Sequence, residues 1–257
     1  MYVRPKKRLG QHFLTDMSVA QRIAAALKVT GCRRTLEIGP GTGVLTQYLL
    51  AREDVELCAV EVDNESVEYL KVEFPNLNLI EADFLEMNFD GEFFEKFNVV
   101  GNFPYNISSQ IFFRILDNRD RVPEVVCMLQ REVAVRLAAG PGGRDYGILS
   151  VLLQTYYDIE YLFTVSEGVF NPPPKVKSGV IRLVRNSRNH LPCDESLFFK
   201  VVKATFNQRR KTIRNSLKGA FPQLSAEHSY FSLRPEVLSC EQFIELTQWL
   251  ENQISNK

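Results

Sequence analysis

The chain has 257 residues and no formal net charge, and its apolar and charged fractions (45% and 24%) are ordinary for a globular protein. That length accommodates one large domain, or one domain with a small appendage. No segment approaches the ~20 apolar residues that cross a bilayer, and no apolar stretch follows the basic N-terminus, so we expect neither a membrane contact nor a secretory signal. Five widely spaced cysteines without a CxxC pair, with only three histidines, favour a cytoplasmic protein with reduced thiols and argue against a disulfide framework or a metal site.

Strand and helix patterns alternate along the first part of the chain. Short apolar runs predict strands at residues 35–39, 55–63, 77–83, 97–102 and 124–130. Helical periodicity predicts helices at residues 18–28, 44–52, 64–74, 106–116 and 131–140, the first of them capped by Asp16 or Ser18. This alternation predicts an α/β fold, with a mostly parallel sheet and helices on both faces. Residues 156–165 and 178–184 have no helix pattern between them and predict an antiparallel pair at one edge of the sheet.

The tail of the chain contains only helical patterns. They cover residues 195–206, 210–221 and 239–253, with Ser239 and Gln242 as a capping box for the last helix. The polar stretch 185–194 lacks apolar periodicity and predicts the domain boundary. We therefore assign residues 1–187 to the α/β domain with its basic N-terminal arm, and residues 188–257 to a small all-helical domain.

Basic residues are concentrated in two runs, RPKKR at 4–8 and NQRRKTIRNSLK at 207–218. One such run is as often a solvated face as a binding surface, but two dense runs in a neutral chain favour contact with phosphate backbones. The candidate RNA-binding residues are Lys6, Lys7, Arg8, Arg209, Arg210, Lys211 and Arg214.

Residues 36–46, LEIGPGTGVLT, predict a strand, a glycine-rich turn and a helix. Gly39 and Gly41 tolerate positive φ and let the backbone approach a ligand closely. Glu61 lies roughly 20 residues further on, where an acidic residue accepts hydrogen bonds from a ribose diol, and Asp83 after the third strand is suited to an adenine amino group. Together they predict a cofactor that contains adenosine, which at this point is either NAD or S-adenosylmethionine.

The stretch VVGNFPYNISS at 99–109 runs from the end of the fourth strand into a loop, and it decides between the two cofactors. With five other motifs in the same order, it resembles the ribosomal RNA adenine dimethyltransferases. The motifs are GQHFL (10–14), EIGPGTG (37–43), GNFPYNIS (101–108), MLQREVAVRL (128–137), FNPPPKVKSGVIRL (170–183) and FNQRRKTIRNSL (206–217). The resemblance implies a Rossmann-like class I methyltransferase domain, a helical C-terminal domain and S-adenosylmethionine as the methyl donor. It also implies two adjacent adenosines near the 3′ end of 16S rRNA, in a hairpin loop of the small ribosomal subunit or its precursor, as the target, and N6,N6-dimethyladenosine as the product.

The chemistry of the target explains the NFPY motif. An adenine N6 amine is a poor nucleophile because its lone pair is delocalised into the ring. Acceptors for its N–H groups, here the Asn102 side-chain oxygen and a main-chain carbonyl around Phe103–Pro104, localise that lone pair. Pro104 stiffens the loop because its φ is fixed, and Tyr105 offers a ring face to the base. Direct displacement then needs positioning and acceptor dipoles rather than a metal.

The resemblance carries further roles onto single positions. Phe170, before the prolines at 172–174, corresponds to a second aromatic wall for the flipped base. The residues matched to the cofactor are His12, Leu14, Gly39, Gly41, Glu61, Asp83 and Asn102. One position departs from the family, because Phe103 stands where leucine is usual. Since the main chain is expected to accept there, we expect this replacement to be tolerated.

Four other functions compete with this one. The nearest is the related 23S rRNA adenine N6-methyltransferase that gives macrolide resistance, which shares the catalytic motifs but not FNQRRKTIRNSL. A ribosome-assembly factor that binds rRNA without methylating it is another, and the complete set of site residues argues against it. A DNA adenine methyltransferase would need a specificity domain, and an NAD dehydrogenase leaves NFPY unexplained. We expect a monomer.

Overall fold

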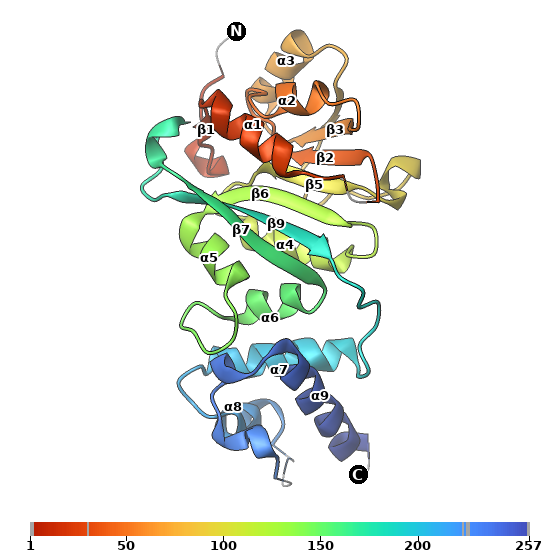
Figure 1. Ribbon diagram of the computed structural model, residues 1–257, viewed down its shortest axis with the longest axis vertical. Coiled ribbons are helices and arrows are strands. Elements are labelled where there is room, and N and C mark those ends of the chain that lie inside the picture. Colours follow the sequence, from red (N-terminus) through yellow and green to blue (C-terminus); the bar gives the residue numbers. More distant parts are fainter. Residues whose placement is uncertain (1–2, 30, 223, 225–226, 256–257) are drawn as a thin grey trace. The chain divides into compact units, whose positions relative to one another are not determined.

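The computed structural model describes residues 3–29, 31–222, 224 and 227–255 (Figure 1). Within them, seven strands form one sheet in the order β4-β3-β2-β5-β6-β9-β7. These strands are β2 (Arg34–Ile38), β3 (Glu56–Glu61), β4 (Asn78–Glu81), β5 (Asn98–Asn102), β6 (Glu124–Gln130), β7 (Tyr157–Val165) and β9 (Ser178–Arg185). The first five are parallel, and β9 pairs antiparallel to β6. The predicted mostly parallel sheet is confirmed.

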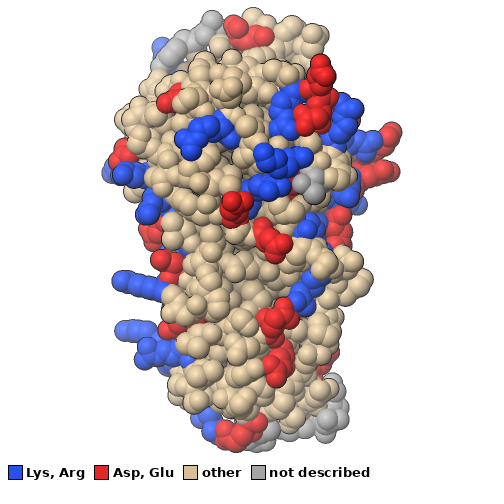
Figure 2. Space-filling model, viewed as in Figure 1, with Lys and Arg blue, Asp and Glu red and all other residues tan. Residues whose placement is uncertain are grey.

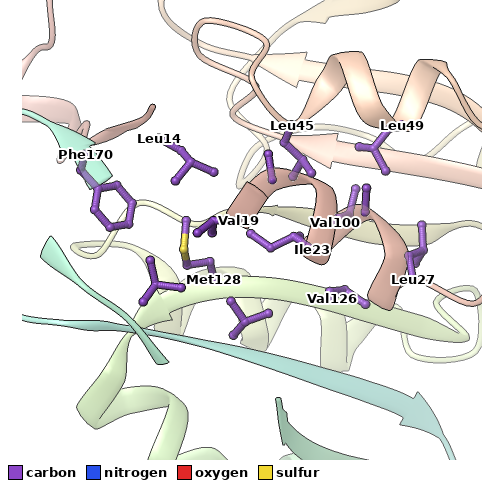
Figure 3. Close-up of a cluster of buried hydrophobic side chains, with 14 of the residues drawn as sticks. Leu14, Val19, Ile23, Leu27, Leu45, Leu49, Val100, Val126, Met128 and Phe170 are labelled. Atoms are coloured by element: carbon purple, nitrogen blue, oxygen red, sulfur yellow. The ribbon is translucent and has the colours of Figure 1, made fainter. Parts of the chain in front are cut away.

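Helices cover both faces of this sheet, with α1 and α4 on opposite sides in Figure 1. The helices along the sheet are α1 (Met17–Ala26), α2 (Thr46–Leu50), α3 (Asn64–Glu73), α4 (Ser108–Asp117) and α5 (Arg131–Ala138). Helix α1 begins after Asp16, whose carboxylate accepts from the N–H groups of Ser18 and Val19 at 2.8 and 3.1 Å, so Asp16 is the cap. Its apolar face packs with α2, β5 and β6 in a buried cluster that includes Ile23 and Val126 (Figure 3).

A second, two-stranded sheet joins distant parts of the chain. It consists of β1 (Phe13–Leu14) and β8 (Phe170–Asn171), in antiparallel register with Leu14 opposite Phe170. Neither strand was predicted, since two residues are too few for an apolar period. This pairing fixes the end of the N-terminal segment, residues 4–15, against the body of the sheet domain.

The chain divides into two compact units. The first comprises residues 1–135 and 158–185, and the second comprises residues 136–157 and 186–257. The sequence analysis places residues 136–157 in the first domain and the boundary after residue 187, whereas the structure groups residues 136–157 with residues 186–257. Residues 136–157 belong to the second unit because their tyrosines are buried there: Tyr156 donates to Glu195 at 2.8 Å, and the rings of Tyr146 and Phe206 meet edge to face.

The described part of the second unit is mainly helical. Its helices include α6 (Ile148–Gln154), which was not predicted, α7 (Glu195–Asn207), α8 (Ile213–Ala220) and α9 (Cys240–Ser255). The predicted capping box of α9 is confirmed, because the Ser239 N–H donates to the Gln242 side chain at 2.9 Å and the Gln242 N–H donates to Ser239 Oγ at 3.2 Å. In the part of the chain that is described, no helix combines the length and apolar character that a membrane span requires.

Glu37 is an acidic side chain that is buried within the sheet. Glu37 on β2 is 1% exposed, and among the described residues its Oε2 has no hydrogen-bond partner. Burial raises the pKa of Glu37 to about 8, because desolvation penalises the charged form. The sequence analysis did not single out this residue.

We predict a pH-dependent stability that Glu37 causes. The folded pKa of Glu37 lies above the unfolded one, so the folded state binds the proton more tightly. The contribution of Glu37 to the free energy of unfolding is therefore complete below about pH 4.5 and is lost as pH rises towards about 8. The loss should reach the order of a few kcal/mol, since a pKa difference of one corresponds to about 1.4 kcal/mol. Glu37→Gln, which stays neutral, should show a flatter profile in urea unfolding between pH 5 and pH 8. Parallel profiles for the two proteins would contradict the prediction.

Candidate active site

A cavity of about 260 Å³ lies at the carboxyl ends of β2, β3 and β5 and beneath the N-terminal segment. This is the edge of a parallel sheet at which such folds bind ligands. The cavity brings together most of the residues predicted for the site: His12, Gly39, Gly41, Glu61, Asp83, Asn102, Pro104 and Tyr105.

The two glycines of the β2 turn have different reasons to be glycine. Both have positive φ, 65° at Gly39 and 59° at Gly41. A Cβ on Gly39 would meet no atom within 4 Å, so this stretch of backbone faces open cavity. A Cβ on Gly41 would lie 2.9 Å from the ring of Phe13. Gly39 therefore lets a ligand approach the main chain, whereas Gly41 lets the N-terminal segment pack on the turn.

Glu61 ends β3 and is 5% exposed. Its carboxylate accepts from three main-chain N–H groups, those of Gly41 (3.1 Å), Val62 (2.9 Å) and Asp63 (2.9 Å). Burial raises its pKa, and the three N–H groups oppose that shift. These bonds tie the glycine turn to the end of β3. Because a carboxylate offers about four acceptor positions and three are used, Glu61 keeps acceptor capacity towards the cavity.

Asp83 follows β4 at the rim of the cavity and is exposed. Its Oδ1 accepts from the Leu85 N–H at 2.8 Å, which fixes the side chain in a turn. With Oδ1 so engaged, Oδ2 is the oxygen that is suited to a ligand. The cofactor roles of Glu61 and Asp83 stay predictions, although both residues lie where those roles require.

Asn102 ends β5, and its amide has a defined orientation. Nδ2 donates to the main-chain carbonyl of His12 at 3.0 Å. A carbonyl can only accept, so the NH₂ end of the amide must face it and Oδ1 must point the other way. Within the described residues, Oδ1 receives no hydrogen bond. Asn102 therefore offers an oxygen acceptor, as the predicted chemistry requires.

The second acceptor is expected to be the main-chain carbonyl of Phe103 or of Pro104, and the two differ in whether another group already donates to them. The Pro104 carbonyl accepts from the Ile107 N–H at 3.2 Å in the turn before α4. The Phe103 N–H donates to the Met128 carbonyl at 2.9 Å, which continues the pairing with β6, and the Phe103 carbonyl has no partner among the described residues. The Phe103 carbonyl is therefore the better candidate.

Tyr105 is held at both its hydroxyl and its ring. The hydroxyl lies 2.5 Å from Ser178 Oγ, and the ring stacks on His12 with centroids 5.4 Å apart and 30° between the planes. Burial raises the pKa of Tyr105, so the phenol keeps its proton at neutral pH. His12 in turn has its Nδ1 at 2.8 Å from the Pro172 carbonyl.

The N-terminal segment is anchored over the cavity by charge and by close packing. Lys6 forms an ion pair with Asp63, which also accepts from Gln11 at 3.3 Å. The hydrogen bond to Asp63 raises the pKa of Lys6. Burial of Asp63 acts to raise the pKa of its carboxyl, but the hydrogen bonds from Lys6 and Gln11 outweigh burial, so the pKa of Asp63 is lowered. A Cβ on Gly10 would overlap the side chain of Asn106, so the segment passes directly over the turn before α4. Lys6 is therefore engaged in this anchor, and its contact with RNA stays a prediction.

The structure corrects the placement of two predicted site residues. Phe170 is 4% exposed and belongs to the buried cluster with Leu14 and Met128 (Figure 3), so it is not an open aromatic wall. Strand β8 has only two residues, and side chains alternate along it, which puts Phe170 inside and Asn171 outside. Leu14 is also buried; it lines not the main cavity but a smaller one of about 30 Å³ beside Gly39 and Asn102.

The candidate RNA-binding residues of the second unit differ in how far they are engaged. Arg209 donates to the Gly143 carbonyl at 3.0 Å and lies 3.8 Å from Glu236, and Arg214 pairs with Glu227 at 2.6 Å. Arg210 and Lys211 are exposed in the loop between α7 and α8, and no ion pair engages them among the described residues.

Exposed basic side chains also occur in the first unit. Lys7 and Arg8 are exposed, and Arg8 lies at the rim of the cavity. On the face drawn in Figure 2, basic and acidic side chains are interspersed. A phosphate contact on that face would therefore involve a few neighbouring basic residues rather than one continuous basic surface. RNA binding by these residues stays a prediction.

Four features together define a Rossmann-like class I methyltransferase: the sheet order, the glycine turn after β2, the acidic end of β3 and the Asn-Phe-Pro-Tyr segment that begins at the end of β5. Residues 3–251 match the family described as "Ribosomal RNA adenine dimethylase". The chain belongs to that family, which confirms the resemblance found in the sequence.

Relatives of nearly full length agree with this assignment. A protein of Parabacteroides distasonis is 57% identical over 95% of this chain and 93% of its own, and one of Cytophaga hutchinsonii is 55% identical over 98% and 99%. Both are named "Ribosomal RNA small subunit methyltransferase A". The crystal structure of a dimethyladenosine transferase from Plasmodium falciparum has the same fold, with a TM-score of 0.76 at 22% identity over 95% of this chain and 98% of that one.

We predict that Phe103→Leu changes stability more than activity. The Phe103 side chain is 1% exposed and meets the ring of Phe112 edge to face, while its carbonyl, the proposed acceptor, is unchanged by the substitution. We expect a loss of about 1 kcal/mol in the free energy of unfolding, with a methylation rate within about two-fold of wild type. A large rate loss at unchanged stability would show that this side chain shapes the site directly.

Proposed function

We propose that this chain transfers methyl groups from S-adenosylmethionine to N6 of two adjacent adenosines near the 3′ end of 16S rRNA, in a hairpin loop, and converts each to N6,N6-dimethyladenosine. The observation that carries the proposal is the pair of open acceptors, Asn102 Oδ1 and the Phe103 carbonyl, beside a cavity bordered by Gly39 and Glu61. The names of the relatives, which span almost the whole chain, support the small subunit as the source of the RNA.

The residues of the cavity fit the methyl donor. Gly39 leaves open space at its backbone, and Glu61 has remaining acceptor capacity for a ribose. Asp83 has Oδ1 engaged by the Leu85 N–H, which leaves Oδ2 for an adenine amine. The donor, when bound, supplies a methyl group on a positively charged sulfur. The chain itself then has to bind, orient and exclude water, because such a displacement needs no metal.

The work of the chain on the target amine is electrostatic. In the first transfer the two acceptors hold the two N6–H groups, draw the nitrogen towards tetrahedral geometry and localise its lone pair towards the donor. In the second transfer N6 carries a single N–H, which one of the two acceptors holds. Each transfer would release neutral S-adenosylhomocysteine as the leaving group and one N6 proton to solvent. Because these dipoles are already oriented by the His12 carbonyl and by the β5–β6 pairing, they need no rearrangement when the reaction occurs. A base must leave its stack to reach them, and stacking on the Tyr105 ring compensates by about 1–3 kcal/mol.

The substrate is proposed to be the small subunit or its precursor in the cytoplasm, bound by a monomer. Exposed Arg210 and Lys211 in the second unit, with Lys7 and Arg8 in the first, are suited to phosphate contacts. The two relatives that are more than half identical over nearly the whole chain are named for the small subunit, which favours 16S rRNA over 23S rRNA as the target. A factor that only binds rRNA would have no use for oriented acceptors at a cofactor cavity.

The direct test is to incubate the protein with labelled S-adenosylmethionine and undermethylated small subunits, and to map the modified nucleotides. Two adjacent dimethylated adenosines near the 3′ end of 16S rRNA are expected. Label in 23S rRNA with large subunits would favour the resistance-type activity, and binding without label would favour an assembly role.

Asn102→Ala should lower the single-turnover methylation rate by roughly 10²–10³-fold, the loss typical of removing one oriented group at such a site. RNA affinity in filter binding should stay near wild type, because the phosphate contacts lie elsewhere. Equal losses of rate and affinity would show instead that Asn102 is a binding or structural element.

Removing the two unengaged basic residues together, Arg210→Ala with Lys211→Ala, should reduce the salt dependence of RNA binding by a slope of about 1–2, since each phosphate contact contributes close to one. Arg209→Ala is the matched control: it breaks the bond to the Gly143 carbonyl, so it should lower the urea midpoint and leave the slope nearly unchanged. The slope is measured by filter binding at several salt concentrations. An unchanged slope in the double variant would show that Arg210 and Lys211 face solvent and do not contact RNA phosphates.

A further inference from the structure

Ser178 is a buried hydroxyl that the proposed mechanism does not use. It is the first residue of β9, is 0% exposed, and has its Oγ 2.5 Å from the Tyr105 hydroxyl, at the short end of the range for O–H···O bonds. The two residues come from distant parts of the chain, and this bond connects the loop after β5 to the start of β9.

The main chain around Ser178 is rigidly placed. Ser178 pairs with Gln130 at the end of β6, and the preceding Lys177 carbonyl accepts from the Arg131 N–H at 2.9 Å. A Cβ on the following residue, Gly179, would lie 2.7 Å from the Ala134 Cβ, so β9 packs closely there. The Ser178 hydroxyl is therefore a fixed point, whereas Tyr105 lies in a turn outside any strand or helix.

Two contacts together define the position of the Tyr105 ring. A bond at the hydroxyl fixes where the tip of the ring lies, but leaves the ring free to rotate about its long axis. The stack on His12, with 30° between the planes, restricts that rotation. Because His12 covers one face, the opposite face is the one left for a base. The stack sets the direction of that face, and the hydroxyl bond sets the position of the ring tip, so both are needed to place the ring.

We infer that Ser178 is a positioning residue, which holds the Tyr105 ring where the flipped adenine stacks while its amine reaches Asn102. This inference rests on the proposed function and assigns Ser178 no contact with substrate or cofactor. Without the bond, the ring would sample other positions, and fewer captured bases would place their amine at the acceptors.

The test is a double-variant cycle in single-turnover methylation with saturating undermethylated small subunits. Tyr105→Phe and Ser178→Ala each remove the same bond and keep the ring, so each should lower the rate about three- to ten-fold, the effect of one hydrogen bond. The double variant should be no slower than either single variant. Multiplied losses in the double variant would overturn the inference, as would a wild-type rate for Ser178→Ala.

Three controls separate positioning from general damage. Affinity for S-adenosylmethionine, measured by calorimetry, and the urea midpoint should change little in Ser178→Ala. Ser178→Thr, which keeps the hydroxyl, should recover most of the rate. Equal losses of rate, cofactor affinity and stability in Ser178→Ala would overturn the inference, because Ser178 would then be a structural residue only.

A spectroscopic readout needs no RNA. With ¹³Cζ-labelled tyrosine, the Tyr105 signal, assigned by its loss in Tyr105→Phe, should shift in Ser178→Ala and return towards its original position in Ser178→Thr. An unchanged signal in Ser178→Ala would overturn the inference. If wild-type protein methylates no RNA, the proposed function fails. A shifted signal in Ser178→Ala would then show only that the bond to Tyr105 forms, and the positioning role would be overturned with the function.

Discussion

The candidate site depends on one hydrogen bond, from Asn102 Nδ2 to the main-chain carbonyl of His12. A side-chain amide has a donor end and an acceptor end, and which end faces the cavity decides whether the site can accept from an amine. The carbonyl settles this, because it can only accept. For the bond to form, the N-terminal segment must lie over the end of β5, and much of the surrounding structure serves that placement.

The segment is held from three directions. Lys6 and Gln11 bind Asp63 beyond the end of β3, Phe13 packs on Gly41 in the turn after β2, and β1 pairs with β8. Each anchor lies at the carboxyl edge of the sheet or beside it. The segment that covers the cavity is therefore the one that orients the acceptor, so that cavity closure and orientation of Asn102 are structurally linked.

The sequence predicted those parts of the structure that periodicity and strand order determine. Parallel strands bring their carboxyl ends to one edge, so Gly39, Glu61 and Asn102 had to meet once the alternation was recognised. The rest depends on contacts without a local signal. Strands β1 and β8 are two residues long, which is why neither their pairing nor the inward orientation of Phe170 was predicted. Ser178 lay within a recognised motif, but only the fold brings its hydroxyl to Tyr105.

The central claim is that Asn102 Oδ1 and the Phe103 carbonyl accept from the target amine. It is tested most directly by a crystal structure of the protein with S-adenosylhomocysteine and a short RNA hairpin that carries the two adenosines. The account predicts that N6 of the flipped adenine lies within about 3.2 Å of both oxygens, with Asn102 Nδ2 still bonded to the His12 carbonyl. An amide turned to present its nitrogen to the base, or an N6 group directed away from both oxygens, would contradict it.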